Sequence, residues 1–530
     1  MRLDSILAKI LLALSIPFLF FSCASSRGDM SSWRSVSPFD YGLVEAKNGV
    51  ERYDVLLRTH QAAVQRGVDV NYKGINRIEI EIPKNATRIP LTDNNDFSGC
   101  EFVIKNRQKT VYLFESLAST KPIVVSKADI DNGEFHGYSE LSKGTRILII
   151  EDSNPWVENR KGYSYGHMRR DILLVKNGKA LNAVVMPYDN EQSSPVCTYC
   201  DAKTFSFKNL TINRTEDCTA ITNVMFVRGR DNVEISNVSL HTPDNEWRND
   251  RAIRIEDCTN VHFNNVLIDG TYSQQGHSGY GISLNTIWNF TGNHIVGRGN
   301  WGIFGTNNVN KTIIENSAIN RFDIHCYGRD VSFSNVCFSE KYNQLNSVYG
   351  SIVFDSCTFT KFDPIRIGSS YNAYVAFDVY FSDCTFYATK GNNCLLRLGE
   401  LNEEVNIRKE LKEKCWPNVY INNMTVNIDE TTTEFILFYS KIDGKESRTP
   451  IHNLSIVDVQ GLTINTPNNK VQLSITPKPI QSVNMVDCKM SAVSLNGHFL
   501  ESIENVRVKT NIPLKSGAIK FVESSESSSY

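Results

Sequence analysis

A short apolar pattern repeats along most of the chain at a nearly constant spacing. Each copy has alternating apolar residues, then an Asn or a small polar residue, then a second alternating pair. The copies around Asn209, Asn237 and Asn265 follow one another at intervals of 28 residues. Alternation with a period of two is typical of strands, and polar residues between strands indicate sharp bends. A repeat of this length predicts an all-β solenoid, in which each coil buries its apolar residues against its neighbours.

The repeated asparagines predict hydrogen bonding between coils. Coils of a solenoid stack about 4.8 Å apart, so an Asn at a bend can bond to its equivalents in the coils above and below. Such bonds would satisfy turn amides that no strand ladder reaches. We expect this asparagine ladder, including Asn237 and Asn265, to be internal to the solenoid.

The cysteines fit the same scaffold. Five of the 13 cysteines occupy similar strand-end positions, and we interpret them as small buried residues with free thiols: Cys258, Cys337, Cys357, Cys384 and Cys488. Cys197 and Cys200 form a single CxxC, which is weak support for a zinc site without a second such pair. A loop disulfide or two unpaired thiols fit these two residues better.

The first residues indicate export. Residues 10–21 are apolar, are too short for a stable membrane-spanning helix, and end shortly before Cys23. The stretch Leu-Phe-Phe-Ser-Cys resembles a bacterial lipobox, in which the cysteine becomes the acylated first residue, although Phe20 stands where Leu is usual. We expect residues 1–23 to be a lipoprotein signal peptide with lipidation at Cys23, and residues 24–37 to be a Ser-rich tether. The alternative is an ordinary signal peptide.

The charge balance of the chain and its expected location restrict the binding partners of the protein. The chain has 56 basic and 58 acidic residues, so no net field would attract it to nucleic acid. A lipid anchor would hold it at the bacterial outer membrane or cell surface, or in the periplasm. We expect a monomer and no nucleic-acid partner.

Residues 38–510 resemble the pectate-lyase-like superfamily. The segment Phe39-Asp-Tyr-Gly, the amphipathic residues 53–67 and the β-rich residues 78–106 look like that superfamily's DYGA motif, capping helix and first coils. The resemblance implies a right-handed parallel β-helix with an N-terminal capping helix, acting on a polysaccharide. Its parts would be a cap with the first coils at 38–200, the repeats at 201–510 and a C-terminal tail at 511–530. No catalytic motif of the polygalacturonases or pectate lyases is present, so the resemblance implies no particular reaction.

A second set of strands suggests where a ligand could bind. If Ile253, Ile282, Ile303 and Ile324 stack inward, their neighbours point outward. Asp323 and His325 would then lie about 7 Å apart on one strand, beside a shallow groove floored by glycine. The floor would consist of Gly281 and Gly302, and glycine lets a substrate approach the backbone.

Two reactions fit the ionisable residues around this groove. A glycoside hydrolase would pair Asp323 with a second carboxyl, for which the candidates are Asp250, Glu246 and Asp330. A polysaccharide lyase would need a cation beside a uronate and a base, which suits Arg254 or Arg329 with His325 or Tyr327. Calcium could supply the positive charge instead.

Aromatic and charged residues near the groove are candidates for contacts with the sugar chain, and several candidate residues also have a purely structural explanation. The candidates for sugar contacts are Trp247, Tyr272, Trp301, His277 and Arg329. Asp323 and His325 could also be solvated ladder residues, His277 a turn residue, and Arg254 a salt-bridge partner of Glu256 or Asp257. The alternatives to an enzyme are a glycan-binding surface lipoprotein without catalysis and a purely structural or adhesive protein.

Overall fold

The computed structural model describes most of the chain from residue 35 onward. The described residues are 35–105, 111–157, 167–185, 187–188, 193–215, 222–242, 251–270, 273–274, 277–278, 280–299, 302–339, 343–345, 348–360, 365–367, 377–398, 417–440, 455–467, 471–475, 480–490, 493–496, 505–510 and 514–515. From Val36 onward they belong to one compact unit, Val36–Tyr530. The expected signal peptide with Cys23 lies outside them. None of the helices among these residues is both long and apolar enough to cross a membrane.

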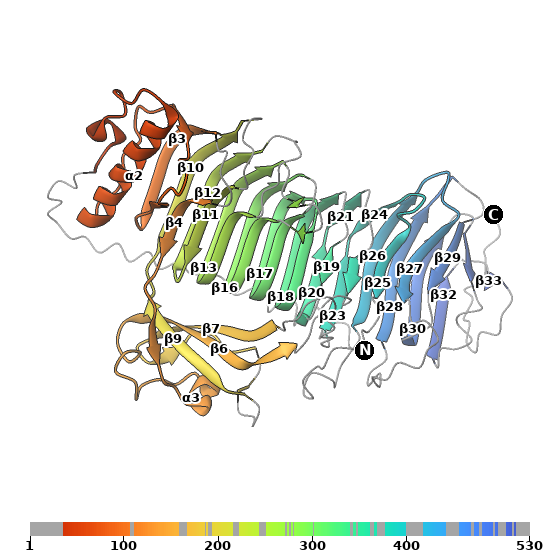
Figure 1. Cartoon of the computed structure of the whole chain (residues 1–530). Coiled ribbons are helices and arrows are strands. Elements are labelled where there is room, and N and C mark those ends of the chain that lie inside the picture. The colour runs from red at the N-terminus through yellow and green to blue at the C-terminus, as the bar shows by residue number, and fades with distance from the viewer. Residues whose placement is uncertain are drawn as a thin grey trace, which may run out of the picture. The chain divides into compact units, whose positions relative to one another are not determined.

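Parallel strands from successive coils build the body of the molecule (Figure 1). The first coils contain β1 (Arg77–Glu81), β2 (Ile89–Pro90), β3 (Asn94–Lys105), β4 (Val111–Leu117), β10 (Phe205–Arg214), β11 (Thr222–Arg228) and β12 (Asp231–His241). The central coils contain β13 (Arg251–Asp269), β16 (Tyr280–Gly297), β17 (Gly302–Ile319), β18 (Phe322–Ser339), β19 (Gln344–Leu345), β20 (Val348–Asp355), β21 (Thr358–Thr360) and β22 (Ile365–Ile367). A short hairpin of β14 (Ser273–Gln274) and β15 (His277–Ser278) precedes β16.

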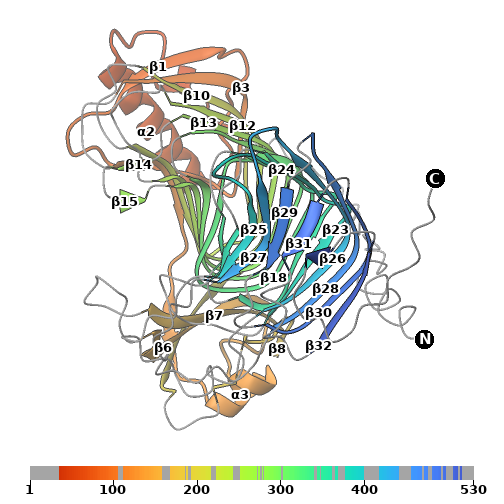
Figure 2. The same ribbon diagram turned by 90° about the vertical axis from the view of Figure 1, so that its right-hand side faces the viewer.

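The last coils continue the same pairing. They contain β23 (Phe377–Ser382), β24 (Thr385–Ala388), β25 (Cys394–Leu398), β26 (Asn418–Ile428), β27 (Glu434–Ser440), β28 (Ser455–Asn465), β29 (Val471–Ile475), β30 (Ile480–Met490), β31 (Val493–Asn496), β32 (Asn505–Thr510) and β33 (Leu514–Lys515). Figure 2, turned by 90°, shows these strands curving around a shared interior. Phe333, Phe354 and Phe381 stack there from coil to coil, with ring centroids 5.2 Å and 5.0 Å apart. The predicted all-β solenoid is confirmed.

The repeated bend needs a left-handed backbone conformation. Asn209, Asn237 and Asn265 have φ angles of 59°, 53° and 54°, a region that Asn tolerates better than most residues. Their side chains form the expected ladder, since Nδ2 of Asn237 donates to Oδ1 of Asn209 and Nδ2 of Asn265 to Oδ1 of Asn237, both at 2.9 Å. The ladder lies on the exposed surface and not inside the solenoid, so the predicted internal position was wrong.

Backbone conformation therefore decides what a substitution at this bend does. Replacing Asn237 with Leu should lower the free energy of opening β12 by about 1–2 kcal/mol, the usual cost of a left-handed residue with a large side chain. Asn237→Gly keeps the backbone conformation and loses only exposed amide bonds, so its loss should be smaller. Native-state hydrogen exchange of β12 measures both, and equal losses would contradict this explanation.

An N-terminal cap closes the first coil. A 3₁₀ turn, η1 (Pro38–Tyr41), precedes helix α2 (Gly49–Arg66), which begins at the N-cap Asn48 and ends at Gly67 in a left-handed conformation. Tyr53, Leu56 and other apolar residues of α2 pack into the solenoid core. The predicted capping helix is confirmed, and it covers an end that would otherwise expose the core.

Residues 121–201 form an antiparallel sheet that the repeat pattern did not predict. It contains β5 (Lys121–Ile123), β6 (Thr145–Val157), β7 (His167–Lys176), β8 (Lys179–Ala180) and β9 (Pro195–Asp201), with α3 (Lys127–Asn132) beside it. One face packs with Trp288 of the solenoid. Arg170 of this sheet also lies 3.1 Å from Asp257 at a solenoid bend, and burial raises the pKa of Asp257 to about 6.

The described cysteines are all free thiols. Of the five strand-end cysteines, only Cys337 is not buried. Cys197 and Cys200 belong to β9 and contribute to two separate apolar clusters, because residues three apart on a strand face opposite sides. A disulfide between them is therefore absent.

Candidate active site

One side chain from each of several coils lies in a single row on one face of the solenoid. The row alternates with the buried core residues of the same strands, so it faces away from the core. Backbone pairing places its members in register: Phe226, Arg254, Ser283, Gly305, Asp323, Gln344, Arg366, Arg397 and Tyr439. With coils about 4.8 Å apart, this outward row spans roughly 40 Å.

The predicted stack of isoleucines is only partly correct. Ile253 pairs with Ile282, but the partner of Ile282 is Phe304, and the partner of Phe304 is Phe322. Both phenylalanines are fully buried, with ring centroids 5.2 Å apart. The large rings fill the interior better than the neighbouring isoleucines, and this shifts the register of β17 and β18 from the one predicted.

The shifted register removes the predicted glycine floor. A side chain at Gly281 would collide with Ile303 and Ile268, and one at Gly302 would press on Arg321. Both glycines are buried, so they do not line an open groove. The glycine next to Asp323 in the outward row is Gly305.

Gly305 makes room for Tyr280. A Cβ atom at this position would overlap the ring of Tyr280, which starts β16 and leans across β17 toward β18. The Tyr280 hydroxyl lies 2.7 Å from Oδ2 of Asp323 and 2.7 Å from Nε2 of His325. A tyrosine from one coil therefore joins the two residues that the sequence singled out on another.

Asp323 is held by a buried ion pair. Nε of Arg321 donates to Oδ1 at 2.6 Å, and Nη2 lies 2.6 Å from Oδ2. The two side chains are 2% and 1% exposed. Burial raises the pKa of Asp323, and the Arg321 charge and hydrogen bonds oppose that rise. The carboxylate faces away from the core, as predicted, but it is covered and bonded through both oxygens.

His325 lies at the other end of this chain of contacts, 2.7 Å from the Tyr280 hydroxyl. Thr306 pairs with Ile324 and Asn307 with Cys326, so His325 is the extra residue of a β-bulge. Bulges redirect side chains and are common beside active sites. A carboxylate only accepts hydrogen bonds, so Tyr280 donates to Asp323 and His325 donates from Nε2 to Tyr280. Nδ1 then carries the basic lone pair of the half-buried imidazole.

Arg254 belongs to a different part of the outward row. Its Nε donates to Oε1 of Glu256 at 2.6 Å, and its guanidinium carbon lies 4.9 Å from the ring centroid of Phe226. It is three coils, roughly 14 Å, from Asp323, so the two residues do not meet at one bond. The ion pair with Glu256 that the sequence suggested is present.

The other predicted residues do not join this cluster or cannot be placed. Arg329 lies 3.4 Å from Asp330, on a part of β18 that pairs with Asn310 and Tyr349 and not with the outward row. Outside the described residues lie Trp247, Asp250, Glu246, Tyr272 and Trp301, and the same holds for the side chains of His277 and Tyr327. Within the described part of the chain, no group of three or more His, Cys, Asp or Glu could hold a metal ion.

A solved structure with the same architecture supports the fold assignment. The tailspike protein gp49 of Pseudomonas phage LKA1 aligns with a TM-score of 0.52 and 14% identity, over 87% of this chain and 82% of that one. The fold is a right-handed parallel β-helix. The Gp54 tailspike of Acinetobacter baumannii bacteriophage AP22, solved with a capsular saccharide, gives a TM-score of 0.48 and 12% identity over 86% of this chain and 79% of that one.

A glycosidase also aligns, at lower similarity. The catalytic domain of a GH87 alpha-1,3-glucanase, solved with nigerose, gives a TM-score of 0.40 and 10% identity over 88% of this chain and 70% of that one. No protein-family model matches the sequence, and no curated protein matches it. The fold agrees with the resemblance noted from the sequence, and it does not identify a reaction.

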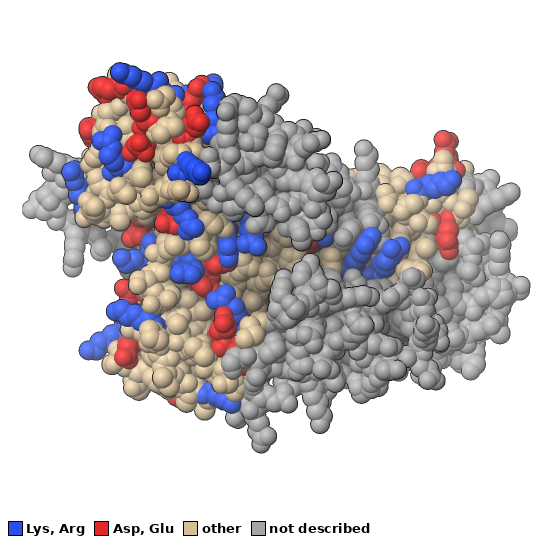
Figure 3. All heavy atoms as spheres, in the orientation of Figure 1, with Lys and Arg blue, Asp and Glu red and all other residues tan. Residues whose placement is uncertain are grey.

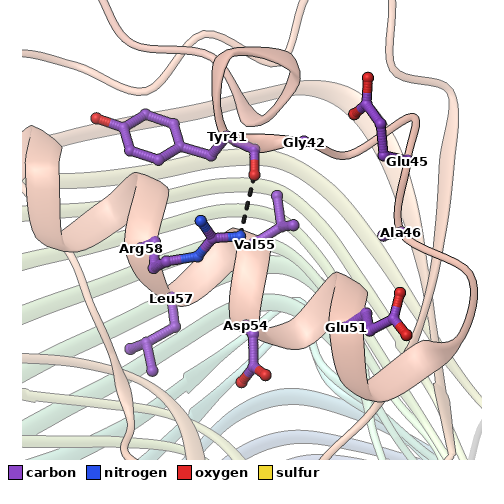
Figure 4. Close-up of a pocket in the computed structure, with 9 residues that line it drawn as sticks. All are labelled: Tyr41, Gly42, Glu45, Ala46, Glu51, Asp54, Val55, Leu57 and Arg58. Atoms are coloured by element: carbon purple, nitrogen blue, oxygen red, sulfur yellow. Dashed lines mark hydrogen bonds between the residues drawn. The ribbon is translucent and has the colours of Figure 1, made fainter.

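A hollow in the cap of the β-helix is a separate feature. It measures about 530 Å³ and lies between η1 and α2, lined by Tyr41, Glu45, Asp54 and Arg58 among others (Figure 4). Arg58 donates to the Tyr41 carbonyl at 3.1 Å, and Glu51 bonds to the backbone of Lys47 at the start of α2. These contacts hold the cap together, and the hollow is not part of the outward row.

The sequence pattern missed Tyr280, Arg321 and Gly305. Tyr280 is 43 residues before Asp323, and only the correct register brings them together. The available signal was the run of phenylalanines at 290, 304, 322 and 333, whose rings form a continuous interior stack. Aligning β17 and β18 on Phe304 and Phe322 would have placed Gly305 beside Asp323.

Proposed function

We propose that the protein binds a linear polysaccharide along the outward row and cleaves it with His325 as the base. The observation that carries this proposal is the relay from Asp323 through Tyr280 to His325 on a β-bulge. A row of polar and charged side chains that crosses many coils suits an extended polymer better than a compact ligand. The nearly balanced charge of the chain argues against a nucleic acid as that polymer.

The relay gives each residue a role in proton transfer. His325 takes a proton at Nδ1, and the hydrogen bond from Nε2 to Tyr280 spreads the new positive charge toward Asp323. Arg321 keeps the Asp323 carboxylate ionised and fixed. Asp323, Tyr280 and Arg321 are positioning residues in this scheme, and His325 is the catalytic residue because it alone of the four is only half-buried.

Base catalysis by histidine fits the described residues better than a two-carboxyl hydrolase. Such a hydrolase needs two carboxyl groups that reach the sugar chain, whereas Asp323 is covered and Glu256 is paired with Arg254. Proton abstraction by His325 can start β-elimination beside a uronate, or it can activate water for hydrolysis. Elimination sends the proton to His325 and the electron pair of the C–H bond into a new double bond. The electron pair of the breaking glycosidic C–O bond stays on the leaving oxygen, which takes a proton from water.

A glycan panel tests the function and separates the two reactions. The protein is incubated with plant, host and microbial polysaccharides, and reducing ends and the ultraviolet absorbance of an unsaturated uronate are followed together. Reducing ends with absorbance indicate a lyase, and reducing ends without it indicate a hydrolase. Binding with no product from any bound glycan would show a non-catalytic glycan-binding protein and would contradict the proposed cleavage.

We also propose that acylation of Cys23 anchors the protein to the bacterial envelope. The apolar residues 10–21 and the lipobox-like stretch support this proposal. Cys23→Ser should release the protein from the membrane fraction, because burial of acyl chains would be the attachment. Fractionation of expressing cells measures this, with Cys197→Ser as a control. If the Cys23→Ser protein still sediments with membranes, the anchor is not this cysteine.

A further inference from the structure

The inserted sheet of residues 121–201 packs against one bend of the solenoid coils. Its strand β7 contacts β13, β16 and β17. Backbone pairing on either side places Asp257, Thr286 and Asn308 at equivalent positions of this bend, and all three have left-handed φ angles. We call the contact between the sheet and this bend the seam. Trp288 packs there against a buried apolar cluster of the sheet that consists of Ile147, Ile149, Ile172, Leu174 and Cys200.

A buried carboxylate stands at the start of the seam, where the next two coils have neutral side chains. Nη2 of Arg170 lies 3.1 Å from Oδ1 of Asp257 and donates to Oδ2 at 3.4 Å, which is a long hydrogen bond. Among the described residues, no donor forms a hydrogen bond with Oδ1. The left-handed bend does not require this charge, because Asn308 adopts the same conformation with a neutral amide.

Charged groups from several strands surround Asp257. Burial is the largest influence and raises the pKa of Asp257, the positive charges of Arg170 on β7 and Arg228 on β11 lower it, and the negative charges of Glu256 on β13 and Glu151 on β6 raise it. Arg170 also lies 3.0 Å from Glu151, so Asp257 shares its nearest cation with a second carboxylate. Ionised Asp257 is therefore poorly compensated while the sheet is docked.

Other groups near the seam do not supply a competing response to pH. The thiols of Cys200 and Cys258 remain neutral, since burial raises the pKa of Cys200 to about 11 and raises that of Cys258 further. On the face shown in Figure 3, acidic and basic side chains lie intermixed over the cap, the first coils and the inserted sheet. A surface of mixed charge produces no strong field of one sign.

We infer that the seam is a pH-sensitive contact, in which ionisation of Asp257 loosens the inserted sheet from the solenoid and protonation tightens it. When the sheet lifts, water reaches the carboxylate and restores its ordinary pKa of about 4. A carboxyl group whose pKa is higher in the docked state than in the open state favours docking at acidic pH. Its contribution to docking is complete below about pH 4 and is lost as the pH rises through about 6.

The seam borders the outward row. Glu256, the residue before Asp257, accepts a hydrogen bond from Arg254 of that row, so opening of the seam at neutral pH frees the margin of the row beside Arg254. The docking equilibrium exists without a substrate, and the inference therefore does not depend on the proposed cleavage.

Two cysteines of β9 report on the seam and on the sheet separately. Cys200 is buried against the solenoid, with its Sγ atom 3.6 Å from the Gly229 carbonyl, whereas Cys197 is buried in the apolar cluster on the other face of the sheet. Full-length protein is treated with a pyridyl disulfide at about pH 5 and pH 7.5, and mass spectrometry of peptides follows each thiol. Each rate is divided by the rate of the same thiol in unfolded protein at that pH, which gives the opening equilibrium.

We expect the opening equilibrium at Cys200 to be about tenfold more favourable at pH 7.5 than at pH 5, as follows from a pKa of about 6 docked and about 4 open. Cys197 should stay protected at both pH values. Asp257→Asn keeps a residue that tolerates the left-handed bend, and Arg170 keeps Glu151 as a partner. This variant should show slow labelling of Cys200 at both pH values.

Asp383→Asn is the matched control. Asp383 is also an aspartate in a left-handed conformation at a solenoid bend, but it is exposed, so this variant should keep the tenfold difference. The inference is wrong if opening at Cys200 in the unmodified protein is the same at both pH values, or if Asp257→Asn keeps the difference. It is also wrong if Cys197 is labelled in parallel with Cys200, because the whole sheet would then unfold and not lift from the solenoid.

Discussion

Replacing His325 with Gln should lower turnover of the cleaved glycan by about 10²- to 10⁴-fold, the usual contribution of a general acid or base. Gln can still donate a hydrogen bond to Tyr280 but cannot accept the proton from substrate or water. The glycan should still bind, because the outward row beside His325 is unchanged. Steady-state kinetics with the glycan identified from the panel measure the effect, which should appear in kcat.

His262 offers a matched control for this change. It is also a half-buried strand histidine, with Nδ1 2.7 Å from the Thr291 hydroxyl. Its strand segment pairs outside the outward row, so His262→Gln should leave turnover unchanged. Near-normal turnover by the His325→Gln protein would place the catalytic base elsewhere, and the segment 243–250 would be the next candidate.

The Tyr280→Phe variant tests whether the relay from Asp323 through Tyr280 to His325 contributes to turnover. Tyr280→Phe keeps the ring over Gly305 and removes the hydroxyl that joins Asp323 to His325. We expect a smaller loss of turnover than for His325→Gln, together with a changed pH profile of kcat/KM. A loss of turnover with an unchanged pH profile would indicate that Tyr280 only supports the fold.

The repeat predicted the scaffold because two physical requirements recur in every coil. Alternating apolar residues must fill the interior, and a residue that tolerates a left-handed backbone must stand at the bend. Asn209, Asn237 and Asn265 satisfy the second requirement, and their spacing follows directly from the length of a coil. The inserted sheet of residues 121–201 was missed because antiparallel strands alternate with the same period of two as the strands of a β-helix.

The site was harder to predict because neighbouring apolar residues compete for the interior. Ile303 and Phe304 are both buried. The alternation of apolar residues in the sequence does not show which of the two pairs with Ile282. A shift of one residue exchanges the two faces of a strand. The sequence therefore singled out Asp323 and His325 correctly as neighbours on an outward strand, but it named Gly302 where Gly305 stands and did not anticipate Tyr280.

Asp323→Asn should destabilise the central coils by about 3–5 kcal/mol, the typical cost of breaking a buried ion pair. An exposed outward carboxylate, as the sequence suggested, would have tolerated the change without loss of folding. The structure places Asp323 against Arg321 with both side chains almost fully buried, so the variant leaves a buried guanidinium charge without its anion. Loss of activity in Asp323→Asn alone would therefore not identify a catalytic carboxylate.

Two comparisons make this prediction specific. Glu234→Gln breaks the more exposed pair of Glu234 with Lys208, whose side chains are 45% and 31% exposed, and should cost about 1 kcal/mol or less. Replacing both partners, Arg321→Met with Asp323→Leu, removes the buried charge along with its anion and should recover part of the stability. Native-state hydrogen exchange of β17 and β18 measures each variant, since coils in a solenoid are stabilised mainly by their neighbours. A loss in Asp323→Asn no larger than that in Glu234→Gln would mean that the Arg321 pair does not hold these coils together, and it would restore Asp323 as a candidate for direct contact with the sugar chain.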